Sequence, residues 1–195
     1  TDHIKSRIRA IAKQDSADIA IIEIGGTVGD IEGQPFLEAI RQMRRELGPE
    51  NGLFIHVTLI PYLGPAGESK TKPTQHSVRE LRNIGIQPDI ILCRTTRPLT
   101  KEMREKIALF CDVVPEAVIE GLDTKSIYEL PLIFERQGFG SLVAKRLGLE
   151  GMPDHSEWER VVKAIEKPKR TATVALVGKY MALQDAYISV TEAIR

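Results

Sequence analysis

The sequence has no excess of charge of either sign and no long apolar run. Its 27 basic residues balance its 27 acidic ones, so we expect no bulk electrostatic attraction to nucleic acid or to an anionic membrane. The apolar runs are too short to span a bilayer, and the chain does not open on a signal-peptide pattern. These features predict a cytoplasmic protein that binds neither nucleic acid nor membrane.

Cysteine is also scarce, since the chain carries only Cys93 and Cys111. Their spacing fits no metal site, and both follow apolar residues, which favours buried free thiols in a reducing compartment. Hydrophobic residues make up 42% of the 195 positions, enough for a packed core. The chain begins and ends inside expected helices, so we expect it to be a piece of a longer protein.

Strand-like and helix-like segments alternate along most of the chain. This order predicts an α/β fold with a mostly parallel sheet flanked by helices. The apolar or β-rich runs expected as strands are 19–23, 53–60, 89–93 and 117–119. The expected helices begin near residues 1, 35, 74–77, 100, 126, 139, 156 and 185. A polar linker at 166–170 precedes a further expected strand at 173–177, which would open a second domain.

The segment Glu23–Glu32 combines glycine with acid directly after an expected strand. Its glycines let the backbone approach a ligand, and the carboxyl ends of strands are where open α/β sheets bind ligands. The carboxylates of Glu23, Asp30 and Glu32 favour a cation or a nucleotide sugar over a simple phosphate cradle. Glu23, at the expected strand end, suits Mg²⁺. The alternative is a glycine-rich turn with solvated acids.

The segment from Lys70 to Ser77 concentrates polar donors in an expected extended loop. Lys70 and Lys72 could offer two ammonium groups to a polyphosphate, and Gln75 could bind a base edge or a ribose. Three hydroxyl side chains add possible donors: Thr71, Thr74 and Ser77. The alternative is an exposed charged loop with a helix cap. Elsewhere, His56 is expected in the core or on a sheet face, and Arg41, Arg44 and Arg45 on a solvated helix face.

Several long segments together resemble the CTP synthases. They are Glu-Ile-Gly-Gly-Thr-Val-Gly-Asp-Ile-Glu at 23–32, Pro-Phe-Leu-Glu-Ala-Ile-Arg-Gln at 35–42, Lys-Thr-Lys-Pro-Thr-Gln-His-Ser-Val at 70–78, Gly-Ile-Gln-Pro-Asp-Ile at 85–90, Lys-Ile-Ala-Leu-Phe-Cys at 106–111 and Ser-Ile-Tyr-Glu at 126–129. The resemblance covers essentially the whole chain. It implies the rear part of a P-loop-like synthetase (amidoligase) domain at 1–150, an interdomain helix and linker at 151–170, and the start of a class I glutaminase domain at 171–195.

The same resemblance implies an activity and partners. CTP synthases make CTP from UTP: ATP phosphorylates O4 of the uracil ring, and ammonia released from glutamine displaces the phosphate. Mg²⁺ is the implied cofactor, CTP the implied product inhibitor, and a homotetramer the implied assembly. The isolated chain is expected to be inactive, because the family's glycine-rich ATP loop and its glutaminase residues find no match within residues 1–195.

Residue roles follow only where this sequence matches the family's motifs. The implied metal ligand is Glu23. The implied CTP and UTP contacts are Asp30, Ile31, Glu32, Lys70, Thr71, Lys72, Pro73, Thr74, Gln75 and Lys106. A looser match implies ATP contacts at Arg94, Leu122, Asp123 and Thr124. No residue of this chain is assigned a certain catalytic role.

Two other functions stay open on the sequence. The chain could be a module that binds CTP or UTP without catalysis, since the pyrimidine nucleotide segments are complete. It could also belong to another ATP-dependent ligase of related fold, similar to dethiobiotin synthetase, although the match at Lys70–Gln75 is specific to pyrimidine nucleotides. An exposed sheet edge further predicts poor solubility of the isolated chain.

Overall fold

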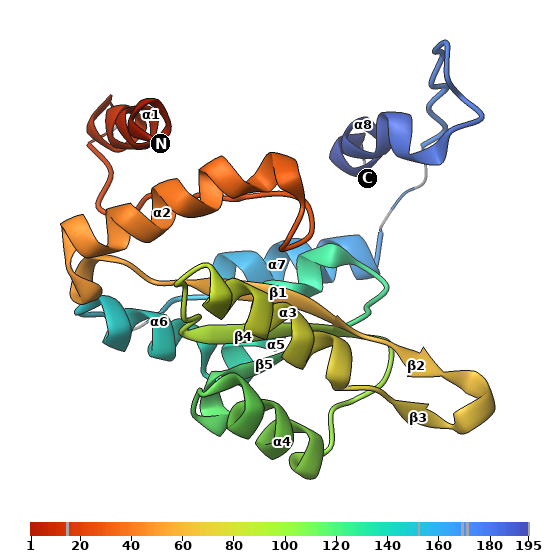
Figure 1. The fold of residues 1–195 in the computed structure, drawn as a ribbon. Helices are drawn as coiled ribbons and strands as arrows, with labels where there is room; N and C mark the ends of the chain where they lie inside the picture. The colour runs from red at the N-terminus through yellow and green to blue at the C-terminus, as the bar shows by residue number, and fades with distance from the viewer. Residues whose placement is uncertain (15, 152, 169, 171, 195) are drawn as a thin grey trace. The chain divides into compact units, whose positions relative to one another are not determined.

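A computed structural model describes residues 1–14, 16–151, 153–168, 170 and 172–194 (Figure 1). The chain forms two compact units, residues 1–153 and residues 154–195, which are described separately. The domain boundaries expected near residues 150 and 170 stay predictions.

The first unit is built on a three-stranded parallel sheet in the order β1-β4-β5. The strands are β1 (Ile55–Ile60), β4 (Ile90–Thr95) and β5 (Val118–Leu122). Helix α3 (Lys72–Asn83) connects β1 to β4, and α4 (Lys101–Cys111) connects β4 to β5 (Figure 1). The expected α/β class with a parallel sheet and flanking helices is therefore confirmed.

Alternation along the strands divides the core between the two faces of the sheet. Ile91 and Cys93 pack with residues of α3 and α4 in one cluster, which includes Val78 and Ile107. Both cysteines belong to this cluster and are free, so the expected buried thiols are confirmed.

The opposite face is covered at β4 and β5 by α5 (Leu130–Arg136) and α6 (Phe139–Leu147). Ile90 and Ile119 pack there against aromatic and aliphatic side chains of the two helices, including Phe134 and Phe139. On β1, Ile55, Val57 and Leu59 alternate on the same face and are 42–59% exposed. The helices on this face therefore leave β1 largely uncovered.

A glutamine side chain occupies the outer edge of β5. The Gln137 side-chain amide donates to Glu120 O at 2.8 Å, and Glu120 N donates to Gln137 Oε1 at 2.8 Å. This two-way pair gives the backbone of β5 the partners that a neighbouring strand would provide.

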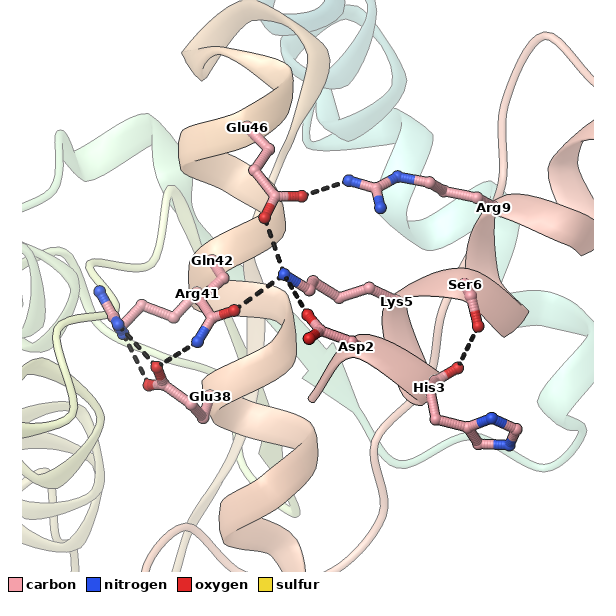
Figure 2. Close-up of polar contacts among 9 residues, drawn as sticks. All are labelled: Asp2, His3, Lys5, Ser6, Arg9, Glu38, Arg41, Gln42 and Glu46. Atoms are coloured by element: carbon pink, nitrogen blue, oxygen red, sulfur yellow. Dashed lines mark hydrogen bonds and ion pairs between the residues drawn. The ribbon is translucent and has the colours of Figure 1, made fainter.

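Helices α1 (Asp2–Gln14) and α2 (Gln34–Leu47) pack together through charged side chains (Figure 2). The Lys5 ammonium lies 2.8 Å from Glu46 Oε1, 2.9 Å from Gln42 Oε1 and 3.0 Å from Asp2 Oδ1, and Arg9 also pairs with Glu46. Only 9% of the Lys5 side chain is exposed, so its charge is compensated by these partners.

Helix α2 is also tied to the start of the sheet by Arg44. Its guanidinium forms a double hydrogen bond to the Asp89 carboxylate, at 2.6 and 2.9 Å, and lies 4.8 Å from the centre of the Phe54 ring. Asp89 Oδ2 also accepts from Phe54 N at 2.8 Å. The expectation of a solvated arginine face is therefore wrong for Arg44, because an acid distant in sequence lies against it.

Two expected strands do not form. Residues 19–23 are irregular and Ile21 is 92% exposed; residues 173–177 are irregular too, and Val177 is 92% exposed. A strand needs the backbone of a neighbour, and within the described residues no segment pairs with the free edge of β1. The prediction of these two strands is therefore wrong, because apolar composition does not show whether a segment has a strand to pair with.

The expected loop at 62–75 is more ordered than its composition indicated. Strand β2 (Tyr62–Leu63) pairs antiparallel with β3 (Glu68–Ser69) around the 3₁₀ turn η3 (Gly64–Ala66). Helix α3 then begins at Lys72, a few residues before the start expected at Thr74 or Ser77. Proline at the start of a helix costs no hydrogen bond, so Pro73 marks a helix start and not a loop.

The remaining elements are short or belong to the second unit. In the first unit these are the 3₁₀ turns η1 (Ile31–Gly33), η2 (Pro49–Asn51), η4 (Pro115–Ala117) and η5 (Ile127–Glu129). The second unit contains α7 (Ser156–Glu166), η6 (Gln184–Tyr187) and α8 (Ile188–Ile194). In the described part of the chain, no helix has the length and apolarity needed to cross a bilayer.

Candidate functional site

The predicted ATP contacts gather where β4 and β5 end. Arg94 lies opposite Gly121 in the parallel register, and Thr95 lies opposite Leu122. The backbone N–H of Asp123 then donates to Thr95 O at 2.9 Å. The structure thus brings Arg94, Leu122 and Asp123 to one edge of the sheet, where α/β proteins bind ligands.

The hydroxyl of Thr124, the fourth of these residues, is used within its own loop. Thr124 Oγ1 donates to Ser126 O at 2.6 Å, just before η5. Arg94 and Asp123 are exposed, so their charged groups are accessible for a ligand.

The Lys70 segment reaches the same edge through the β2–β3 hairpin. Lys70 N donates to Pro61 O at 2.9 Å, which anchors the segment beside the end of β1. Across the edge, the Arg97 guanidinium lies 5.2 Å from the centre of the Tyr62 ring, and Thr95 Oγ1 donates to Arg97 O at 2.7 Å. The loop after β4 therefore contacts the hairpin after β1, a link that the sequence analysis missed.

The two lysines of this segment lie in different settings. Lys70 pairs with Glu68 of the hairpin. Lys72 is exposed in the first turn of α3 and, within the described residues, has no ion-pair or hydrogen-bond partner. The expectation that both project from one extended loop is wrong, because the helix starts between them.

The threonines of this segment face the protein rather than solvent. Thr71 is buried and its hydroxyl accepts from the Gln75 side-chain amide at 3.1 Å. Thr74 is fully buried, with its hydroxyl 3.0 Å from that of Thr58 on β1. Their expected role as hydroxyl donors to a phosphate is therefore wrong in this structure. The Gln75 side-chain carbonyl still offers an acceptor.

The acidic glycine loop is closed by its own carboxylate. Asp30 Oδ2 accepts from Thr27 N at 2.9 Å, and Asp30 N donates to Thr27 O at 3.0 Å. Gly26 and Gly29 have φ of 88° and 107°, a conformation that suits glycine. Ile31 is 82% exposed, and Glu23 and Glu32 are exposed as well.

The carboxylates expected near a metal do not form a cluster of ligands in this structure. In the described residues, no group of three or more acidic, histidine or cysteine side chains could hold a metal ion. A lone carboxylate still suits Mg²⁺, which usually keeps waters and phosphate oxygens as its other ligands. Glu23 therefore fits the role of one ligand among several.

Lys106 makes no hydrogen bond or ion pair with the other candidate site residues among the described residues. It is exposed on α4, beside the buried Ile107, and within the described residues it has no ion-pair or hydrogen-bond partner. Its proposed contact with a nucleotide is not explained by the arrangement within one chain.

Comparison with known proteins matches the chain to a family. The family model described as the CTP synthase N-terminus covers residues 1–149. This chain belongs to the CTP synthase N-terminal family. Among curated relatives, CTP synthases of Caldanaerobacter subterraneus, Symbiobacterium thermophilum and Roseiflexus are 60%, 59% and 58% identical over the whole chain. The chain spans 35–36% of the length of these CTP synthases.

Proposed function

We propose that the protein containing this chain converts UTP to CTP, using ATP and ammonia from glutamine. The observation that carries this proposal is the convergence of two segments at the carboxyl edge of one sheet. The start of α3 with Lys72 and Gln75 lies there, and so do Arg94 and Asp123. The family membership supports the same reaction.

The chemistry of this edge suits a nucleoside triphosphate. Lys72 and Arg94 provide exposed positive charge, and the first turn of α3 presents backbone N–H groups that helical hydrogen bonding leaves unused. Phosphoryl transfer depends mainly on positioning and on neutralisation of charge. We assign the segment Lys70–Gln75 to UTP and CTP through side chains other than the buried Thr71 and Thr74. We assign Lys106 to the same nucleotides, and Arg94 with Leu122–Thr124 to ATP.

Mg²⁺ would be held by Glu23 together with phosphate oxygens and water, and when bound it neutralises phosphate charge. The segment Asp30–Glu32 would contact CTP acting as an inhibitor. Two further parts of the proposal are a homotetramer and the inactivity of these 195 residues alone.

Lys72 provides the test. In the full-length protein, Lys72→Ala should raise the KM for UTP on the order of tenfold, because a charge-assisted contact to phosphate is lost. The matched control is Lys13→Ala, which removes the same side chain from α1. CTP formation would be followed at varied UTP. Equal KM values for both variants and the unaltered protein would overturn the assignment of Lys72.

A further inference from the structure

Two hydrogen-bonded side-chain pairs join β1 to α3, in addition to a long contact from the Thr74 hydroxyl to Leu59 O at 3.5 Å. Thr58 and Thr74 place their hydroxyl oxygens 3.0 Å apart, and His56 Nε2 lies 2.8 Å from Ser77 Oγ. Residues two apart share a face of a strand, and residues three apart share a face of a helix. Both bonds therefore lie along one line between the strand and the helix.

These hydrogen bonds add a directional constraint to the apolar packing between α3 and β1. Hydrophobic contact depends mainly on area and has little directionality, so the packing of Val78 and its neighbours alone specifies the position of α3 along β1 less sharply than hydrogen bonds do. A hydrogen bond fails within a few tenths of an ångström. Two of them, one turn of helix apart, fix how far α3 extends along β1.

The depth of the Thr58–Thr74 pair shows that it serves the protein and not a ligand. Thr74 is fully buried, and its hydroxyl also lies 3.5 Å from Leu59 O. Yet Thr74 lies in the first helical turn, two residues after Lys72 and one before Gln75. Any shift of Thr74 along β1 must therefore move the exposed Lys72 and the half-buried Gln75 at the carboxyl edge.

We infer that the residues of the Thr58–Thr74 and His56–Ser77 pairs are positioning residues. They fix the position of α3 along β1 and so place Lys72 and Gln75 for the nucleotide. This inference rests on the proposed function for the identity of the ligand. Thr74, expected from the sequence to contact the nucleotide, would instead hold α3 in the position that presents Lys72 and Gln75.

A double substitution separates positioning from simple stability. Thr74→Val alone removes the oxygen partner of the buried Thr58 hydroxyl and leaves it only the weak contact to Cys93 Sγ at 4.0 Å, which should lower the urea midpoint of unfolding. Replacing both threonines by valine removes both polar groups at nearly constant volume, and the midpoint should return towards that of the unaltered protein. If the pair only stabilises the fold, the KM for UTP should return to its original value in the double variant together with the midpoint. A positioning role predicts that KM stays raised, on the order of tenfold, because the direction of the contact is lost.

Three measurements in the full-length protein complete the test. Thr74→Ser, which keeps the hydroxyl, should retain a KM close to that of the unaltered protein. Asp89→Asn, which destabilises the opposite end of the sheet, should lower the midpoint without raising KM. Hydrogen exchange at the amide of Gln75, which donates to Thr71 O at 3.2 Å, should be faster in the double variant than in the unaltered protein.

The outcomes are distinct. Recovery of both midpoint and KM in the double variant, or unchanged amide exchange, would overturn the inference. If the unaltered protein does not bind UTP in calorimetry, the proposed function fails. Amide exchange then still decides whether the two pairs hold the start of α3.

Discussion

The strongest stability prediction concerns Asp89, which joins α2 to the beginning of the sheet. Only 9% of its side chain is exposed, and its carboxylate accepts three hydrogen bonds, two from Arg44 and one from Phe54 N. Asp89→Asn keeps the volume but removes the charge, and it turns one acceptor into an N–H₂ group that faces these donors.

The magnitude follows from the setting of the pair. Removing one partner of a fully buried ion pair costs about 3–5 kcal/mol. Arg44 is 25% exposed, so water can solvate part of its released charge. We therefore expect Asp89→Asn to lower the free energy of unfolding by about 2–3 kcal/mol.

Urea unfolding followed by circular dichroism would measure this loss. The matched control is Asp18→Asn, the same chemical change at an exposed residue outside any helix or strand. A double variant in which Arg44 and Asp89 both become leucine should lose less than Asp89→Asn alone, because the remaining partner, Arg146, lies 4.0 Å from Asp89 Oδ1 and is 49% exposed, so water can solvate its charge. A change for Asp89→Asn within about 0.5 kcal/mol of the control would refute the reasoning.

Two further predictions concern titratable groups. Burial raises the pKa of Cys93 to about 12 and that of Cys111 to about 11, so both thiols should react slowly with a chromogenic disulfide reagent in the native protein and quickly in denaturant. Fast reaction of either thiol in the native state would contradict its burial. Hydrogen bonding to Lys5 holds the pKa of Glu46 below its ordinary value of 4.5. A lowered carboxyl pKa stabilises the fold above the ordinary value and loses that contribution as the pH falls below it. We therefore expect hydrogen exchange in α1 to rise, relative to α3, as the pH drops below 4.5. Equal pH dependence in both helices would show that these ion pairs do not hold α1.

Much of the sheet and its helices could be predicted because the signals are local. Thr100 caps α4 as its residue type indicates, accepting from Met103 N, and α6 begins at Phe139 as expected from the sequence. The parallel arrangement follows from the alternation of strands with helices. Each of these signals lies within a few residues of the element that it defines.

The failures involve partners distant in sequence. The apolar run at 19–23 looks like a strand, but strand formation depends on a neighbour that no local pattern supplies. Thr74 looks like a ligand donor until Thr58, sixteen positions earlier, is placed against it. The convergence of Arg94 with Asp123 could be predicted from strand ends, whereas the contact of Arg97 with Tyr62 could not.

The hydrogen bonds of Gln137 to β5 make the two edge strands of the sheet differ in how readily they could pair with a further strand. At β5 the glutamine amide already occupies the backbone groups of Glu120, so an incoming chain would have to displace it. At β1 the backbone groups remain available beside the exposed side chains of Ile55, Val57 and Leu59. Any extension of this sheet, by another part of the protein or by a misfolded copy, should therefore proceed in one direction only, outward from β1.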